Sequence, residues 1–423
     1  EEPHTATATT NLTPISEISG SSLKKSALPA FSDSEGARDS SASPAAPMDT
    51  DSHPPSFMES DPAVRREQED SGGRVNTDED ENEAEEEPVT YLRLGVDYEV
   101  DPADTDISIQ CGRIRKFENL EQCTNLQSLC LIANHVRALE NLEHNIHLTR
   151  LELYQNAITQ IANISHLTQL RVLDLSFNQI RKIENIETLV QLEKLYLSSN
   201  KITKIEGLDN LVGLKLLELG SNRIRVIEGV SQLQQLEELH LGKNKITSMA
   251  LPVLPRLTTL TLQSNRLEEW DASVFANTGL QELYLSHNAL SNVPQDICRL
   301  VELETLDLAS NKIGDLAPLA GLMKVEDLWM NDNAVEDIKQ VEHLKAITSL
   351  KTLYLERCPL QYKLGPGYRM AVTSTLPGLN QLDAAEVRAT ITVHTRPLVG
   401  RVGQRAGGAD RKEGGVVKSI MKR

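Results

Sequence analysis

The sequence predicts an α/β repeat fold, a leucine-rich-repeat solenoid of about twelve repeats, because one pattern of leucines and asparagines recurs along most of the chain. The pattern LxxLxLxxN returns at intervals of 21 to 23 residues. Its asparagines are Asn134, Asn156, Asn178, Asn200, Asn222, Asn244, Asn265, Asn288, Asn311 and Asn333. One such unit cannot bury its own apolar face and is stable only between copies of itself. The recurrence therefore predicts one continuous stack.

Each half of the repeat predicts its own element. We count positions from the first leucine of LxxLxLxxN, so the asparagine is position 9. In the first half, a short strand points the leucines at positions 4 and 6 inward, and the asparagine turns inward to satisfy backbone groups of the turn. The second half steps by three residues, as in Ile180, Ile183 and Ile186, which favours 3₁₀ or short helical turns. We expect parallel strands on the concave face and these turns on the convex face.

The two ends of the stack depart from the pattern, as terminal repeats usually do. Gly112 takes the asparagine place of a degenerate first repeat, and Cys358 takes that of the last. We predict the solenoid at residues 91–362. Residues 363–395 are predicted to form a C-terminal repeat cap, since an open end would expose unpaired backbone and leucines.

Charge and composition separate the flanks from the repeats. Residues 1–88 hold 21 acidic and 6 basic residues and few aromatics, so we predict a disordered acidic leader at 1–90. Residues 396–423 hold eight Lys or Arg and two acidic residues, which predicts a flexible basic tail. The net charge of −18 argues against nucleic acid as the main partner, because phosphate binding needs a basic face.

Several function classes lack their sequence signals. The five cysteines are scattered without CxxC spacing, which indicates reduced thiols and no metal site or cofactor. No apolar run approaches the roughly 20 residues that a membrane span needs. The chain has neither a GxxxxGK[ST] phosphate loop nor a GxSxG elbow. Asp174 and Glu218 would lie about 10 Å apart at ~4.8 Å per strand, without a histidine or metal constellation. We therefore expect no enzyme.

The candidate binding residues lie at position 5, which faces the concave surface with positions 3, 7 and 8. Down the ladder, position 5 is Cys130, Glu152, Asp174, Tyr196, Glu218, His240, Thr261, Tyr284, Asp307, Trp329 and Tyr354. Four of these are aromatic, although aromatic residues make up only 4% of the chain. Strand propensity explains one or two of them. Aromatic residues interleaved with carboxylates are typical of a protein-binding hot spot that faces a basic partner.

Other residues extend this surface. Position 3 adds Glu238, Glu282 and Asp327, and Tyr154 and Phe177 stand at the rim. The predicted partner-binding residues are Glu152, Asp174, Tyr196, Glu218, His240, Tyr284, Asp307, Asp327, Trp329 and Tyr354. The alternative interpretation is that the same residues have only a structural role in the strands.

The repeats resemble those of the 22-residue leucine-rich-repeat regulatory subunits of protein phosphatase 1. The resemblance covers about residues 90–395 and includes the segments NKITKIEGLDNL, LDLASNKI, LWMNDNAVED and LYLERCPL. WMNDN and YLER lie on variable positions, so they are more specific than the shared leucines. The resemblance implies a non-enzymatic regulator that binds the phosphatase catalytic subunit with its concave face.

By resemblance, seven residues match the contact positions in both motif and type: Asp174, Tyr196, Glu218, Asp307, Asp327, Trp329 and Tyr354. His240 departs, because the family more often has an aromatic residue there. The resemblance also implies a monomer before binding, action in the nucleus and cytoplasm, and control of the phosphatase in mitosis. It implies a role in maturation, in which the catalytic subunit is held in a metal-depleted form with a second inhibitor protein.

A second class of protein uses the same repeat. Leucine-rich-repeat scaffolds of the dynein-assembly, tubulin-folding or spliceosomal type would share the leucines and asparagines. They would lose the pattern of Asp, Tyr, Glu and Trp at position 5 or add a further folded domain.

Overall fold

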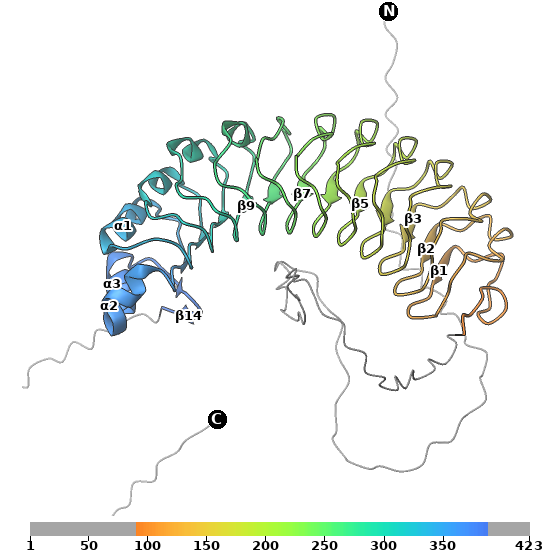
Figure 1. The fold of residues 1–423 in the computed structure, drawn as a ribbon, viewed down its shortest axis with the longest axis horizontal. Helices are drawn as coiled ribbons and strands as arrows, with labels where there is room; N and C mark the ends of the chain where they lie inside the picture. Colours follow the sequence, from red (N-terminus) through yellow and green to blue (C-terminus); the bar gives the residue numbers. More distant parts are fainter. Residues whose placement is uncertain (1–89, 388–423) are drawn as a thin grey trace, which may run out of the picture.

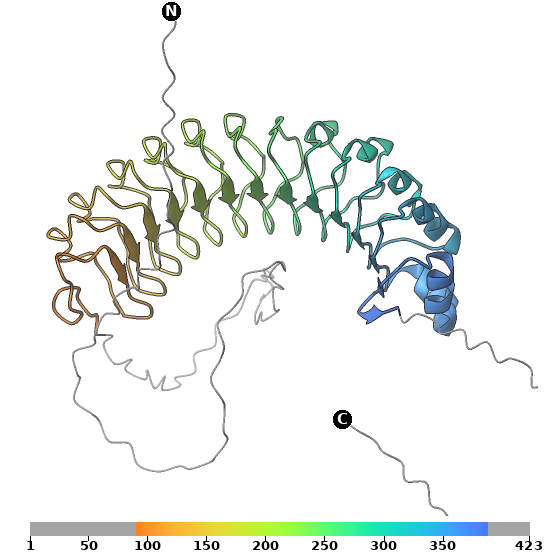
Figure 2. The ribbon, with the colours of Figure 1, turned by 180° about the vertical axis from the view of Figure 1, so that it is seen from behind.

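The computed structural model describes residues 90–387 and shows a curved stack of parallel strands (Figures 1 and 2). All strands form one sheet in the order of the sequence. The twelve strands of the repeats are β1 (Asp106–Ser108), β2 (Ser128–Cys130), β3 (Arg150–Glu152), β4 (Val172–Asp174), β5 (Lys194–Tyr196), β6 (Leu216–Glu218), β7 (Glu238–His240), β8 (Thr259–Thr261), β9 (Glu282–Tyr284), β10 (Thr305–Asp307), β11 (Asp327–Trp329) and β12 (Thr352–Tyr354). They line the inner side of the arc, which confirms the predicted solenoid and its concave sheet.

The convex side changes its structure along the stack. Continuous 3₁₀ or α-helices of the described residues appear only after β8, as η1 (Ala272–Ala276), η2 (Gln295–Arg299), η3 (Ala317–Gly321), α1 (Ile338–His343) and η4 (Leu344–Ala346). The earlier repeats keep the expected step of three as single i→i+3 turns: Leu189 N donates to Ile186 O at 3.0 Å, and Leu192 N donates to Leu189 O at 2.9 Å. In six of these repeats the residue just before the turns takes a positive φ: Asn119, Asn141, Asn163, Asn185, Gly207 and Gly229. A left-handed residue cannot continue a helix, so the turns there stay short.

The leucines of the pattern form one continuous core. In the repeat of β5, Leu195 and Leu197 are fully buried, and their equivalents Leu217 and Leu219 in the next repeat are too. The same cluster runs from Leu94 to Leu382. Each repeat thus buries its apolar face against its neighbours, as the instability of a single unit requires.

The asparagines connect neighbouring repeats as well as their own turns. Asn200 Nδ2 donates to Leu175 O of the preceding repeat at 2.9 Å and to Leu197 O of its own repeat at 3.0 Å. Its Oδ1 accepts from Ile180 N at 2.9 Å. One buried amide therefore satisfies backbone groups of two repeats, and the equivalent bonds recur along the ladder.

Both ends of the described stack are covered. At the N-terminal end Leu92 forms a parallel bridge with Ile114. At the other end lie α2 (Pro359–Leu364), η5 (Gly365–Gly367), α3 (Tyr368–Thr375), β13 (Gln381–Leu382) and β14 (Ala385–Glu386). Asp383 satisfies backbone groups after β12, since its Oδ1 accepts from Leu355 N at 2.8 Å and from Glu356 N at 2.9 Å.

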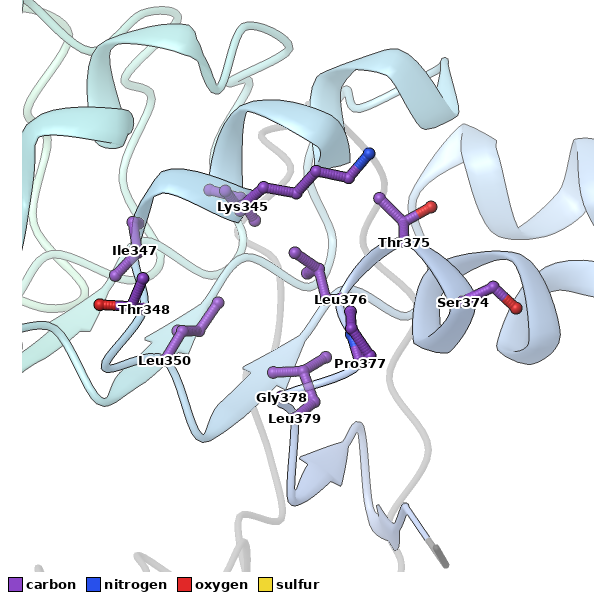
Figure 3. A pocket seen from close by; sticks show the side chains of 11 residues that line it. Lys345, Ile347, Thr348, Leu350, Ser374, Thr375, Leu376, Pro377, Gly378 and Leu379 are labelled. Carbon is purple, nitrogen blue, oxygen red and sulfur yellow. The ribbon is translucent and has the colours of Figure 1, made fainter. Parts of the chain in front are cut away.

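Several predicted segments fall outside the described residues. These are the acidic leader up to residue 89, residues 388–395 of the predicted cap, and the basic tail at 396–423. Within the described part, a cleft of about 500 Å³ separates the last repeat from the cap (Figure 3). Leucines and Pro377 line much of this cleft, and Lys345 is the only charged side chain in its lining. It carries no cluster of titratable groups.

Candidate protein-binding surface on the concave face

The register of the sheet brings the predicted site residues into adjacent rows. We call these ten residues of β3 to β12 the concave strip: Glu152, Asp174, Tyr196, Glu218, His240, Tyr284, Asp307, Asp327, Trp329 and Tyr354. Strand pairing aligns Asp174 with Tyr196 and Tyr196 with Glu218. Asp307 is aligned with Tyr284 on one side and Trp329 on the other. The unshifted pairing of successive strands, which follows from the nearly constant repeat length, produces these rows.

Three aromatic rings gather at the C-terminal half of the strip. Trp329 lies 6.0 Å from Tyr284 and 6.2 Å from Tyr354, measured between ring centroids. Tyr284 and Trp329 are two strands apart, about 9.6 Å at ~4.8 Å per strand. Their rings must therefore lean toward each other across the strand between them. The result is one half-buried aromatic cluster over three repeats.

Asp307 lies on the strand beneath the two leaning rings and is only 5% exposed. Its Oδ1 accepts from Ala309 N at 3.0 Å. Burial raises the pKa of Asp307, although hydrogen bonds from Ser286 and Ala309 oppose the shift. Asp307 thus supports the aromatic cluster and adds negative potential beneath it, and it offers little surface for direct contact.

The two tyrosine rings of the cluster form hydrogen bonds with polar neighbours. Tyr284 Oη donates to Glu282 Oε2 at 3.2 Å. Gln381 Nε2, from β13, donates to Tyr354 Oη at 2.7 Å. These bonds fix the ring directions before any partner arrives, which lowers the entropic cost of binding. Glu282 and Gln381 are additional residues of the site; only Glu282 was visible from position 3 of the repeat.

The other acids of position 5 repeat one local bond. Asp174 Oδ1 accepts from Ser176 N at 2.8 Å, and Glu218 Oε1 accepts from Gly220 N at 3.0 Å. Burial raises the pKa of both carboxyl groups despite these bonds. Each acid therefore stabilises the turn after its strand and also presents charge to the concave face. These bonds agree with the structural interpretation, and the role of both acids in binding stays a prediction.

His240 lies among carboxylates at the middle of the strip. Its Nε2 is 3.1 Å from Glu238 Oε2, and its Nδ1 is 3.4 Å from Thr261 Oγ1. Burial lowers the pKa of His240, but the bond to Glu238 and the charges of Glu218 and Glu282 outweigh it, so the pKa is raised overall. The protonated ring places a local positive charge among the carboxylates of the strip.

The charge of His240 gives a testable pH dependence. In NMR titration of the full chain, we expect its midpoint above the ordinary 6.5. Because the folded pKa is raised, protonation of His240 stabilises the fold below about 6.5, and this contribution is lost as pH rises through the folded pKa. Glu238→Gln should lower the midpoint, whereas the exposed control Glu228→Gln should not. An unchanged midpoint in Glu238→Gln would contradict the assigned pair.

The N-terminal part of the strip is more neutral. Arg150 donates to Glu152 in an ion pair on β3. Tyr154 and Phe177 lie in contact at the rim, with ring centroids 4.8 Å apart and ring planes tilted by 52°, and Phe177 is 45% exposed. This end therefore offers an aromatic rim with little net charge, and the exposed negative charge is concentrated farther along the stack.

Other kinds of site are not visible in the described part of the chain. Residues 90–387 contain no group of three or more His, Cys, Asp or Glu side chains arranged to hold a metal ion. Among the same residues, every helix is too short or too polar to cross a membrane.

Two family models agree with the fold. Both describe leucine-rich repeats, and they match residues 144–248 and 255–313. A solved leucine-rich-repeat protein of Leptospira interrogans is similar at 27% identity and a TM-score of 0.60, over 66% of this chain and 71% of that one. The chain is thus a leucine-rich-repeat protein, a class whose stacked strands present a concave surface.

Two curated relatives are similar over shorter segments. Protein phosphatase 1 regulatory subunit SDS22 of Schizosaccharomyces pombe is 40% identical over 76 residues, which are 18% of this chain and 23% of that protein. Cilia- and flagella-associated protein 410 of Homo sapiens is 31% identical over 88 residues, or 21% of this chain and 34% of that protein. The chain therefore spans about a third or less of the length of either relative.

Proposed function

We propose that this chain is a non-catalytic regulatory subunit that binds the catalytic subunit of protein phosphatase 1 through the concave strip. The observation that carries the proposal is the aromatic cluster of Tyr284, Trp329 and Tyr354 set among carboxylates. The similarity to SDS22 supports the identity of the partner. Under this proposal the chain controls the activity, maturation or targeting of the enzyme in the nucleus and cytoplasm, including in mitosis.

The strip suits a globular partner with a basic surface. Large rings contribute most to binding when they are preorganised and lose water on contact. Carboxylates around them select a positive surface and speed association. Asp327, at position 3 of the same strand as Trp329, supplies such a charge. The strands of successive repeats lie side by side along the inner side of the arc (Figure 2), so side chains at the same position of many strands share one face.

A leucine-rich-repeat scaffold for another assembly is the second candidate. The similarity to cilia- and flagella-associated protein 410 favours it. This candidate predicts that the concave strip binds a protein other than the phosphatase, namely a component of the assembly for which the chain is the scaffold. It also predicts no stable complex with the phosphatase.

The two candidates are distinguished by calorimetric titration of the purified full chain with the phosphatase catalytic subunit, both metal-loaded and metal-depleted. We expect a one-to-one complex with at least one form, with or without the second inhibitor protein, and weaker binding at high salt because charges contribute. Absence of a complex with either form at tens of micromolar, with or without that inhibitor, would contradict the proposal. Quantitative capture from a lysate would then identify the partner of the second candidate.

A further inference from the structure

A row of basic side chains follows the concave ladder along one edge of the first seven repeats. They occupy the first, third and fourth places after the ladder asparagine or Gly112. The residues of this basic edge are Arg113, Arg115, Lys116, Arg137, Arg181, Lys182, Lys201, Lys204, Arg223, Arg225 and Lys245. The corresponding five-residue segments, 112–116 through 244–248, contain no acidic residue. The eighth segment, 265–269, ends the row with Glu268 and Glu269.

Described carboxylates compensate the charge of this edge only in part. Against the eleven basic residues of the row, the sixth place after the ladder residue is a glutamate in five of these repeats: Glu118, Glu140, Glu184, Glu206 and Glu228. Lys182 and Lys204 pair with neighbouring glutamates at 3.4 and 3.6 Å, and such exposed pairs contribute little. Arg181, Arg223 and Arg225 are exposed and have no ion pair with a described carboxylate. Six of the seven repeats carry such a charge, and only the third segment, 156–160, has none. Neighbouring strands lie about 4.8 Å apart. The sum is a positive surface that attracts an anionic segment.

The described chain begins beside this edge. Leu92 N donates to Arg113 O at 3.2 Å, and Leu92 pairs with Ile114. The guanidinium of Arg115 lies over the Tyr91 ring, 5.0 Å from its centroid. Tyr91 also contacts His135 in the second repeat, with centroids 5.5 Å apart. These contacts fix the entry of the chain at the start of the basic row.

The sequence just before this entry has the opposite charge. Residues 78–87 contain eight acidic residues in ten, and only Pro88 and Val89 separate them from Thr90. Ten extended residues reach at most about 33–36 Å. Seven stacked repeats cover about 29 Å at ~4.8 Å per strand. The acidic run is therefore long enough to follow the whole basic edge.

We propose that residues 78–87 bind along the basic edge of the same chain, across the first seven repeats. A tether of a few residues gives an effective concentration on the order of millimolar, so weak individual charge pairs suffice. The bound run covers the edge and excludes other polyanions, including nucleic acid. This interaction lies on a different side chain row from the concave strip and does not depend on the phosphatase.

The first test is carbodiimide cross-linking of the full chain, which joins a carboxylate to a lysine amine with loss of water. In monomeric protein we expect cross-links from residues 78–87 to Lys182, Lys201, Lys204 or Lys245. They should disappear in 0.5 M salt, where the Debye length falls to about 4 Å. Cross-links confined to other lysines, such as Lys345 and Lys351, would overturn the proposal.

The second test measures competition. A fluorescent peptide of residues 78–87 is titrated into the native chain and into a variant whose eight acids are changed to Asn or Gln. We expect at least tenfold tighter peptide binding to the variant, because its own run no longer occupies the edge. Equal affinities would overturn the proposal. So would single-stranded RNA that binds the native chain as tightly as the variant, since the edge would then be open.

A matched set of charge reversals locates the contact. In the neutralised chain, Arg181→Glu with Arg223→Glu and Arg225→Glu should abolish peptide binding. The control carries the same charge change at exposed residues elsewhere, namely Arg256→Glu, Arg299→Glu and Lys339→Glu. It should retain the binding. Equal losses in both sets would show a non-specific effect of net charge and contradict the assigned edge.

Discussion

Replacing Trp329 and Glu218 together by alanine is expected to weaken capture of the phosphatase catalytic subunit by at least about 100-fold, while the repeats remain folded. A buried tryptophan hot spot contributes about 2 kcal/mol or more, or roughly 30-fold in affinity. Trp329 is the central ring of the aromatic cluster. Glu218 lies five strands away on β6, so the two losses should be nearly additive. Titration calorimetry of native and variant chains measures the change.

The control for this double variant removes one aromatic ring and one glutamate from the outside of the molecule. Tyr362 is 73% exposed on α2, and Glu228 is exposed on a convex segment. Tyr362→Ala with Glu228→Ala should leave the affinity within about twofold. Thermal unfolding and circular dichroism should show both double variants folded. Unchanged affinity in the Trp329 and Glu218 variant, with the complex itself formed, would remove the concave strip as the interface without removing the partner.

The rows of the strip could be predicted from sequence because a constant repeat length fixes which residues become neighbours. Spacing alone places Trp329 two strands from Tyr284. It does not give the side-chain torsions that lean the two rings toward each other. Nor does it give the burial of Asp307, which is only 5% exposed although it stands at the same position 5 as the half-buried rings. The same limit applies to the bond between Glu238 and His240.

Two other features had sequence signals that the position 5 pattern did not include. Asparagines and glycines recur at Asn141, Asn163, Asn185, Gly207 and Gly229, and their positive φ values precede the short convex turns of these repeats. The basic edge is equally visible as Lys and Arg just after the ladder asparagines. A net charge of −18 concealed it, because most of the negative charge lies before residue 89. The basic edge is visible only in the charge at each position of the repeat, not in the net charge of the chain.

The second large effect is a loss of stability on replacing one of the buried asparagines that connect neighbouring repeats. Asn222 is 7% exposed, and its Nδ2 donates to Leu197 O at 2.9 Å and Leu219 O at 3.0 Å. Its Oδ1 accepts from Ile202 N at 3.0 Å. Asn222→Ala should lower the free energy of unfolding by about 2–4 kcal/mol, because it leaves a buried N–H unpaired and removes two further bonds. Denaturant unfolding of the full chain measures the loss.

Asn222→Asp distinguishes the acceptor role of the amide oxygen from the donor role of the amide nitrogen. The carboxylate can still accept from Ile202 N, but it faces the carbonyl oxygens of Leu197 and Leu219 without a proton to donate. We expect a loss at neutral pH at least as large as that of alanine, and partial recovery as pH falls, because the protonated carboxyl can donate again. Asn210→Ala removes only an exposed bond to Glu187 O and should change stability by less than about 0.5 kcal/mol. If Asn222→Asp were as stable as the native chain at neutral pH, donation to the two carbonyls would not be what connects the repeats. The concave rows would then be aligned by strand pairing and leucine packing.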